Sequence, residues 1–124
     1  RALNILLIDN DPDHLKAVER FLRVRQHEVR STTSAEEGLA FLADRPAGLV
    51  LCDIQMPEMD GVEFLKAVRR EHPDTAVVLV TGHATVDTAV AALRLGAADY
   101  LRKPIKLEEL QACVRRVRGD PLAW

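Results

Sequence analysis

LVLCDIQMPEMDG, residues 49–61, is the stretch that decides the fold, because an apolar run stops there at a carboxylate, Asp53. A short β-favouring run bounded by turn residues is typical of a buried strand, so Asp53 is expected at a strand's carboxyl end. Pro57 cannot continue a strand ladder and Gly61 permits unusual backbone angles, which predicts a turn before a helix that begins near Asp60. Open parallel sheets bind ligands at the carboxyl edge, so Asp53 is the candidate reaction centre.

Strand-like and helix-like stretches alternate along the whole chain. The expected strands are 3–8, 28–33, 49–53, 75–80 and 97–102, and the expected helices are 12–25, 34–45, 60–72, 86–96 and 107–118. Such alternation predicts an α/β domain, with a parallel sheet and helices on both faces. Five strands in one small domain suit the flavodoxin-like order 2-1-3-4-5 or one of its relatives.

The length and the charge limit the classes of function. A chain of 124 residues makes one module, which we expect at residues 1–118, followed by the start of a linker or tail at 119–124. The net charge of −2, from 17 basic and 19 acidic side chains, gives no bulk attraction to nucleic acid or to anionic membranes. No apolar run approaches the roughly 20 residues that span a bilayer, so we expect a cytoplasmic module that binds neither nucleic acid nor membrane.

The cysteines, histidines and C-terminal arginines outside this pattern favour structural roles. Cys52 and Cys113 are expected to be small buried hydrophobes rather than a disulfide or a metal site. Arginines at 115, 116 and 118 are expected to be solvated in a last helical turn that the helix dipole favours. Three histidines lack metal-ligand spacing and are expected to be solvated: His14, His27 and His72.

Polar residues end four of the five expected strands. If the sheet is parallel, one rim brings together the turn at 9–11, Asp53, Thr81 and Lys103. Clustered carboxylates recruit a cation, and hard oxygen ligands suit Mg²⁺. The metal, the Lys103 ammonium and the Thr81 hydroxyl together would position a phosphoryl group, with Asp53 as the nucleophile that forms an aspartyl phosphate.

At four places the chain resembles the response-regulator receiver domains of two-component signalling. The resemblance rests on Leu7-Ile8-Asp9, on Asp53 followed by Met56-Pro57 and Met59-Asp60-Gly61, on Val80-Thr81-Gly82, and on Asp99 to Pro104. It covers residues 3 to about 117. The sequence of residues 81–90 is similar to that of receivers of the nitrogen-regulation type, which precede an ATPase and a DNA-binding domain.

The resemblance implies a role for each matching residue. Asp53 would be the phosphoacceptor, Lys103 the phosphoryl partner before a cis Lys103-Pro104 peptide, and Thr81 with Tyr100 the switch pair. The implied Mg²⁺ ligands are Asp9, Asn10, Asp53 and the backbone carbonyl of Gln55, with Asp11 as a further candidate. Gln55 and His83 occupy positions that tune the lifetime of the phosphoryl group.

Asn10 departs from the family pattern, in which two adjacent acids hold the metal. An amide oxygen at Asn10 replaces the second carboxylate, so we expect weaker Mg²⁺ binding with function retained.

The resemblance also implies partners and a signalling role without an external product. The phosphoryl donor would be a sensor histidine kinase or a phosphotransfer protein. Phosphorylation would change the surface made by the helix at 86–96, the strand at 97–102 and the helix at 107–118. That surface would contact a second copy or an output domain outside this chain, such as one that regulates transcription.

Three alternatives stay open at this point. A receiver-like interaction module that is not phosphorylated is favoured only by Asn10. A haloacid-dehalogenase-like phosphatase would use the D-x-D turn at 9–11, but the chain is short for that class and leaves Asp53 without a role. A flavin-binding module would need a Ser-, Thr- and Gly-rich first loop, and this loop is acidic.

Overall fold

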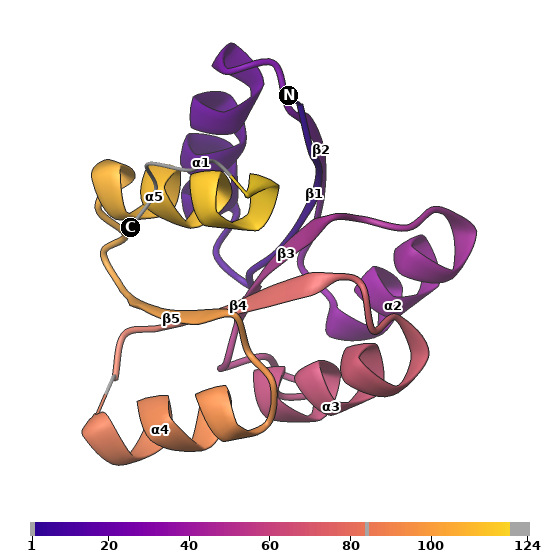
Figure 1. Ribbon diagram of the computed structural model, residues 1–124, viewed down its shortest axis with the longest axis vertical. Helices are drawn as coiled ribbons and strands as arrows, with labels where there is room; N and C mark the ends of the chain where they lie inside the picture. Colours follow the sequence, from indigo (N-terminus) through magenta and orange to yellow (C-terminus); the bar gives the residue numbers. More distant parts are fainter. Residues whose placement is uncertain (1, 84, 120–124) are drawn as a thin grey trace.

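The computed structural model describes residues 2–83 and 85–119, and it contains five strands and five helices in strict alternation (Figure 1). The strands are β1 (Asn4–Ile8), β2 (Glu28–Thr32), β3 (Leu49–Asp53), β4 (Ala76–Thr81) and β5 (Asp99–Arg102). The helices are α1 (Pro12–Val24), α2 (Ala35–Asp44), α3 (Gly61–Glu71), α4 (Val86–Arg94) and α5 (Leu107–Arg118). The sequence pattern predicted each element to within two residues at each end; the largest differences are at the end of α4, which stops at Arg94, and at the start of β5, which begins at Asp99.

All neighbouring strands of the sheet are parallel and their order is β2-β1-β3-β4-β5, which confirms the predicted topology. Helices α1 and α5 cover one face, and α2, α3 and α4 cover the other (Figure 1). Because side chains alternate along a strand, each inner strand contributes to both cores. On β3, for example, Leu49 and Leu51 pack towards α1 and α5, whereas Val50 and Cys52 pack towards α2 and α3.

The helix boundaries follow the capping residues in the sequence. Ser34 accepts a hydrogen bond from the backbone N–H of Glu37, and Asp60 accepts one from Glu63. Gly96 follows α4 with a φ of 99°, in the left-handed region where glycine is favoured. These local signals explain why the element boundaries were predictable.

Gly61 corrects one expectation about the turn after β3. The φ angle of Gly61 is not in the left-handed region. Among the described glycines, only Gly96 and Gly119 have φ angles in that region. A Cβ at Gly61 would lie 2.7 Å from Ile54 Cα and 2.9 Å from the Asp53 carbonyl oxygen. Glycine is therefore required here for close approach of α3 to the end of β3, not for an unusual backbone angle.

Helix α4 forms where its apolar spacing predicted, but most of that apolar face is exposed. Only Ala92 of α4 is buried, against the core beneath α2 and α3. Val86 is 79% exposed, and Val90 and Leu93 are 41% and 50% exposed. Apolar spacing indicated the helix correctly, but no neighbouring element of the described chain covers that face.

Several side chains expected in solvent are buried or paired instead. His27 is only 6% exposed, and its Nδ1 accepts a hydrogen bond from the Leu3 backbone N–H at 3.0 Å. The guanidinium of Arg116 donates to the carboxylate of Asp99 on β5.

Cys52 and Cys113 are free and buried, as predicted. Gly119 caps α5 in the left-handed conformation, and the expected linker lies almost entirely outside the described residues.

Candidate functional site

Strand register brings the predicted site residues to one edge of the sheet. Ile8 pairs with Cys52, so the residues that follow them, Asp9 and Asp53, lie side by side at the carboxyl ends of β1 and β3. Thr81, the last residue of β4, pairs with Arg102, which places Lys103 directly beyond it. Residues from four strands thus meet at the edge where parallel sheets bind ligands.

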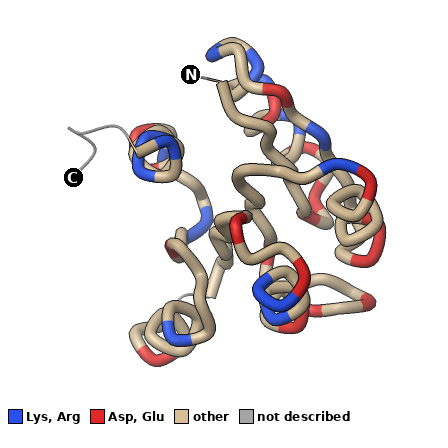
Figure 2. Tube along the Cα trace, turned by 45° about the vertical axis from the view of Figure 1, so that its right-hand side comes forward, with Lys and Arg blue, Asp and Glu red and all other residues tan. Residues whose placement is uncertain are grey.

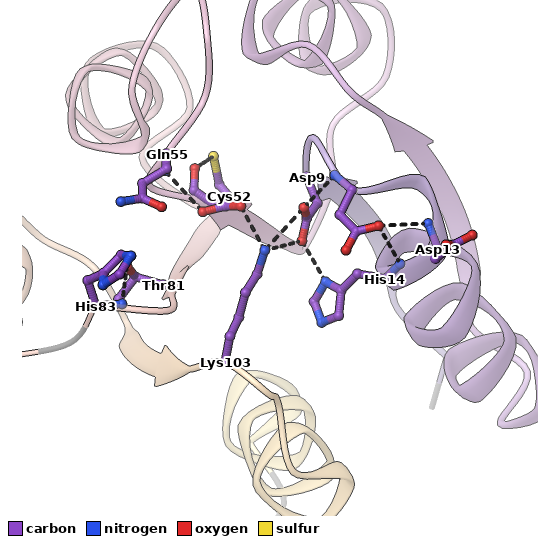
Figure 3. Close-up of polar contacts among 10 residues, drawn as sticks. Asp9, Asp13, His14, Cys52, Gln55, Thr81, His83 and Lys103 are labelled. Carbon is purple, nitrogen blue, oxygen red and sulfur yellow. Dashed lines mark hydrogen bonds and ion pairs between the residues drawn. The ribbon is translucent and has the colours of Figure 1, made fainter.

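Lys103 joins the two carboxylates of this edge. Its Nζ lies 2.8 Å from Asp53 Oδ2 and 3.0 Å from Asp9 Oδ2. Figure 3 shows the Lys103 side chain reaching towards Asp9. Asp9 and Asp53 are each 4% exposed, so the three charged groups are largely withdrawn from water. The following peptide, Lys103-Pro104, is cis, as the family resemblance implied. One cation against two buried carboxylates leaves an acidic site that favours a further positive charge.

The pKa values of Asp9 and Lys103 move in the directions expected of an ion pair. Burial raises the pKa of Asp9, but hydrogen bonds from His14, the Asp11 backbone and Lys103 outweigh it and leave the pKa lowered. Burial lowers the pKa of Lys103, and its bonds to Asp53 and Asp9 outweigh that effect and leave the pKa raised. Both groups are therefore charged at neutral pH.

His14 is a neighbour of the site that the sequence analysis placed in solvent. Its Nδ1 donates to Asp9 Oδ2 at 2.5 Å, and its side chain is 22% exposed (Figure 3). His14 also lines a small cavity together with Asp9 and Asp53. The sequence feature that could have indicated this contact is the position of His14 in the first turn of α1. That helix starts three residues after Asp9, so its first turn lies close to the Asp9 carboxylate.

The predicted metal ligands divide between buried and exposed positions. Asp9 and Asp53 are buried, whereas Asn10 and Asp11 are exposed. The Asp11 carboxylate caps α1 by accepting from the N–H groups of Asp13 and His14, at 3.0 and 3.4 Å. The backbone N–H of Gln55 donates to Asp53 Oδ1 at 3.0 Å, which places the Gln55 peptide beside that carboxylate.

These donors fit magnesium. Within residues 2–83 and 85–119, no three His, Cys, Asp or Glu side chains form a metal-holding group. Two carboxylates with amide and carbonyl oxygens form the sparse, hard-oxygen set that Mg²⁺ uses while it keeps several waters. The Asp11 carboxylate, a further candidate ligand, also caps α1.

The expected switch residues lie on neighbouring strands. Thr81 is buried, and its Oγ1 accepts from the His83 backbone N–H at 3.1 Å, while the His83 side chain is exposed (Figure 3). Tyr100 on β5 is half-buried, and its hydroxyl lies 2.8 Å from Thr88 Oγ1 on α4. This hydrogen bond ties β5 to α4.

Comparisons with known proteins agree with this geometry. The family model of the response regulator receiver domain matches residues 5–115. The transcriptional regulatory protein ZraR of Escherichia coli O157:H7 is 37% identical over 114 residues, which are 92% of this chain and 26% of ZraR. The nitrogen assimilation regulatory protein NtrX of Azorhizobium caulinodans is 36% identical over 117 residues, 93% of this chain and 26% of NtrX.

Comparison with solved structures supports the same fold. A CheY-like response regulator receiver domain protein from Methanospirillum hungatei superimposes with a TM-score of 0.89 at 29% identity, over 96% of each chain. The chain spans about a quarter of the length of the curated relatives it matches. None of the described helices is long and apolar enough to cross a membrane. With a family match over most of its length and this edge of acidic, hydroxyl and lysine side chains, the chain belongs to the response regulator receiver domain family of two-component signalling.

Proposed function

We propose that Asp53 accepts a phosphoryl group from a phosphohistidine of a sensor histidine kinase or phosphotransfer protein. The observation that carries this proposal is the 2.8 Å contact between Asp53 Oδ2 and Lys103 Nζ at the carboxyl edge of the sheet. This contact places a cation beside the carboxylate, where phosphoryl oxygens would gather.

The transfer needs little covalent chemistry from the protein. A carboxylate oxygen of Asp53 attacks phosphorus, the P–N bond of the phosphohistidine breaks, and the imidazole leaves with the electron pair of that bond. Lys103 would stabilise the charge on the phosphoryl oxygens, and the Thr81 hydroxyl would donate to one of them. Water later cleaves the acyl phosphate and regenerates Asp53, so the domain acts as a switch and yields no external product.

The ligands proposed for Mg²⁺ are Asp9, Asp53, Asn10 and the carbonyl of Gln55. When bound, Mg²⁺ supplies positive charge that neutralises and positions the phosphoryl oxygens. Asn10 offers a neutral oxygen where the family has an acid, so we infer weaker metal binding than two adjacent acids give. The positions of Gln55 and His83, each two residues beyond a site residue, support a role in setting the lifetime of the phosphoryl group.

The proposed response to phosphorylation is a change at the α4-β5-α5 surface. If Thr81 moves towards the phosphoryl group, its bond to His83 is lost and the start of α4 is free to shift. Tyr100 would then leave Thr88 and turn inward. The exposed apolar side chains of α4, among them Val86, Val90 and Leu93, support this surface as the contact with a second copy or an output domain. Residues 119–124 would begin the connection to that domain, and the whole would work in the cytoplasm.

The decisive experiment measures the intact mass after incubation with Mg²⁺ and acetyl phosphate. We expect the mass of one phosphoryl group on the unmodified chain, and none on Asp53→Asn or when the metal is chelated. No gain by a folded chain would favour an interaction module that is not phosphorylated. A gain that persists in Asp53→Asn would move the acceptor to the turn at 9–11.

A second variant separates phosphorylation from its readout. Thr81→Ala should still be phosphorylated on Asp53, because Thr81 is not the acceptor. Its phosphorylation-dependent self-association, or association with the output domain, should be weakened. Association that is unchanged in Thr81→Ala would show that the signal does not pass through the hydroxyl.

A further inference from the structure

A cavity of about 310 Å³ lies between the C-terminal ends of α1 and α5, far from Asp53. It sits at the amino edge of the sheet, because His27 directly precedes β2 and bonds to Leu3, just before β1. The residues of its wall that matter here are Phe21, Arg25, His27, Gln111, Arg115 and Arg118. The proposed phosphorylation uses none of them.

The wall of this cavity is strongly basic. Three of the residues that line it are arginines, and no Asp or Glu is among the described lining residues. Basic residues in a last helical turn can simply offset the helix dipole, and Arg25 does so in part by donating to the Phe21 carbonyl at 3.1 Å. Two helix C-termini carry together about one negative charge. The guanidinium groups of Arg25 and Arg115 alone exceed that, so the cavity retains a positive charge. Figure 2 shows basic residues on α5, the helix that leads to the C-terminal end.

His27 adds a neutral donor to this wall. Its Nδ1 accepts from the Leu3 N–H, so the proton of the neutral ring is on Nε2. Burial, and then the charges of Arg118 and Arg25, lower the pKa of His27, so the ring is neutral at pH 7. No hydrogen bond among the described residues uses Nε2, and His27 lines the cavity. Nε2–H is therefore available to a ligand there.

An apolar floor accompanies the donors. The Arg25 guanidinium stacks over the Phe21 ring at 3.6 Å from its centroid, and Leu22 and Val114 line the same cavity. The volume of 310 Å³ is at the lower end of small-molecule sites. Arginine is favoured where phosphate oxygens are recognised, and donors that converge from two helices and a loop suit a tetrahedral anion better than a planar one.

We propose that this cavity binds a small organic phosphate monoester, with its phosphate on Arg25, Arg115 and the Nε2–H of His27 and its organic part on Leu22 and Val114. The site is separate from Asp53, and its ligand is held without transfer of the phosphoryl group. An acidic protein segment or a nucleic acid is a different class of ligand, for which the cavity is small.

The test is an NMR titration of the full chain with phenyl phosphate, which is a stable ester and not an acyl phosphate donor. We expect saturable shifts of the amides around His27 and Arg115, and a rise in the pKa of His27 as the anion binds. Phenol, which lacks the phosphate, should produce neither. Arg115→Gln should weaken binding about tenfold, the usual effect of losing one charge-assisted hydrogen bond.

Two further variants keep the test decisive. Arg70→Gln removes an exposed arginine from the last turn of α3, outside the cavity, and should leave the dissociation constant unchanged. His27→Asn keeps an acceptor for the Leu3 N–H but removes the Nε2–H donor, and should weaken binding severalfold while circular dichroism shows the fold intact. Absence of binding, shifts confined to Thr81 and Asp53, or equal losses in Arg115→Gln and Arg70→Gln would overturn the proposal.

Discussion

Lys103 Nζ and Asp53 Oδ2 lie 2.8 Å apart, although 50 residues separate them in the chain. Lys103 also reaches Asp9, so one ammonium group separates two carboxylates that are almost fully withdrawn from water. Like charges in such a site repel strongly unless a cation lies between them. Lys103 therefore stabilises the unphosphorylated domain as well as the proposed phosphoryl group.

Replacing this lysine tests that dual role. Lys103→Met should lower the free energy of unfolding by about 1–3 kcal/mol near pH 7 without metal, because two buried carboxylates then face each other without the ammonium group between them. The raised pKa of Lys103 means that its contribution is fully present below its ordinary pKa of 10.5 and is lost as pH rises through the folded value. Urea unfolding at neutral pH, with and without Mg²⁺, measures the loss, and Mg²⁺ should restore part of it.

The pH dependence provides a second check on Lys103→Met. The lowered pKa of Asp9 means that its stabilising pair is present above 3.8 and is lost as pH falls through the folded value. The difference in unfolding free energy between the variant and the unmodified chain should therefore shrink as Asp9 takes up a proton. Lys66→Met, at an exposed position on α3, is the control. Equal losses in the two variants would contradict a special role for Lys103.

Gly61 and Gly82 form a matched pair for the packing around Asp53. Gly61→Ala should destabilise the chain by about 1–3 kcal/mol, because its Cβ would meet the backbone of Asp53 and Ile54 within 3 Å. It should also slow phosphorylation, since the displaced backbone carries the acceptor. Gly82→Ala, with nothing within 4 Å of the added Cβ, should leave both properties near their original values. Thermal unfolding and phosphorylation rates should be measured for both variants. A larger effect of Gly82→Ala would contradict the close packing assigned to Gly61.

Asp11 can be tested as a helix cap against its candidacy as a metal ligand. Asp11→Ala should cost about 1 kcal/mol of stability, because the N–H groups of Asp13 and His14 lose their acceptor. Asp11→Ser keeps a capping oxygen without the charge and should recover most of that loss. Calorimetric titration with Mg²⁺ should give nearly equal affinities for Asp11→Ser and the unmodified chain. A clear loss of Mg²⁺ affinity in Asp11→Ser would indicate that the Asp11 carboxylate is a metal ligand.

Local patterns in the sequence were sufficient for the elements and for the main site. Capping residues such as Ser34 and Asp60 define helix starts within a few residues, and buried strands end where apolar runs meet polar residues. Parallel strands in a known order then bring Asp9, Asp53 and Lys103 together without any knowledge of side-chain positions.

Features that depend on packing between distant segments could not be predicted in this way. His14 and His27 look alike in the sequence, yet one pairs with Asp9 and the other is buried against Leu3. The apolar residues of α4 have helical spacing, but burial depends on a neighbour, and among the described elements none covers that face. The role of Gly61 depends on the distance to β3, which the sequence does not contain.

His27 should make the stability of the domain depend on pH between about 7 and 5. Its pKa in the folded chain is lowered, whereas the unfolded chain has the ordinary value of 6.5, so the unfolded state takes up the proton first as pH falls. The stability that neutral His27 provides is thus fully present above 6.5 and is lost as pH falls towards the folded pKa. Arg118 and Arg25, which line the cavity beside His27, and the N-terminal amino group oppose its protonation. His27→Asn keeps an acceptor for the Leu3 N–H and does not titrate, so its unfolding free energy should decrease less over this range. Chemical unfolding of both chains across this pH range measures the difference. Parallel curves would show that His27 has an ordinary pKa in the folded protein.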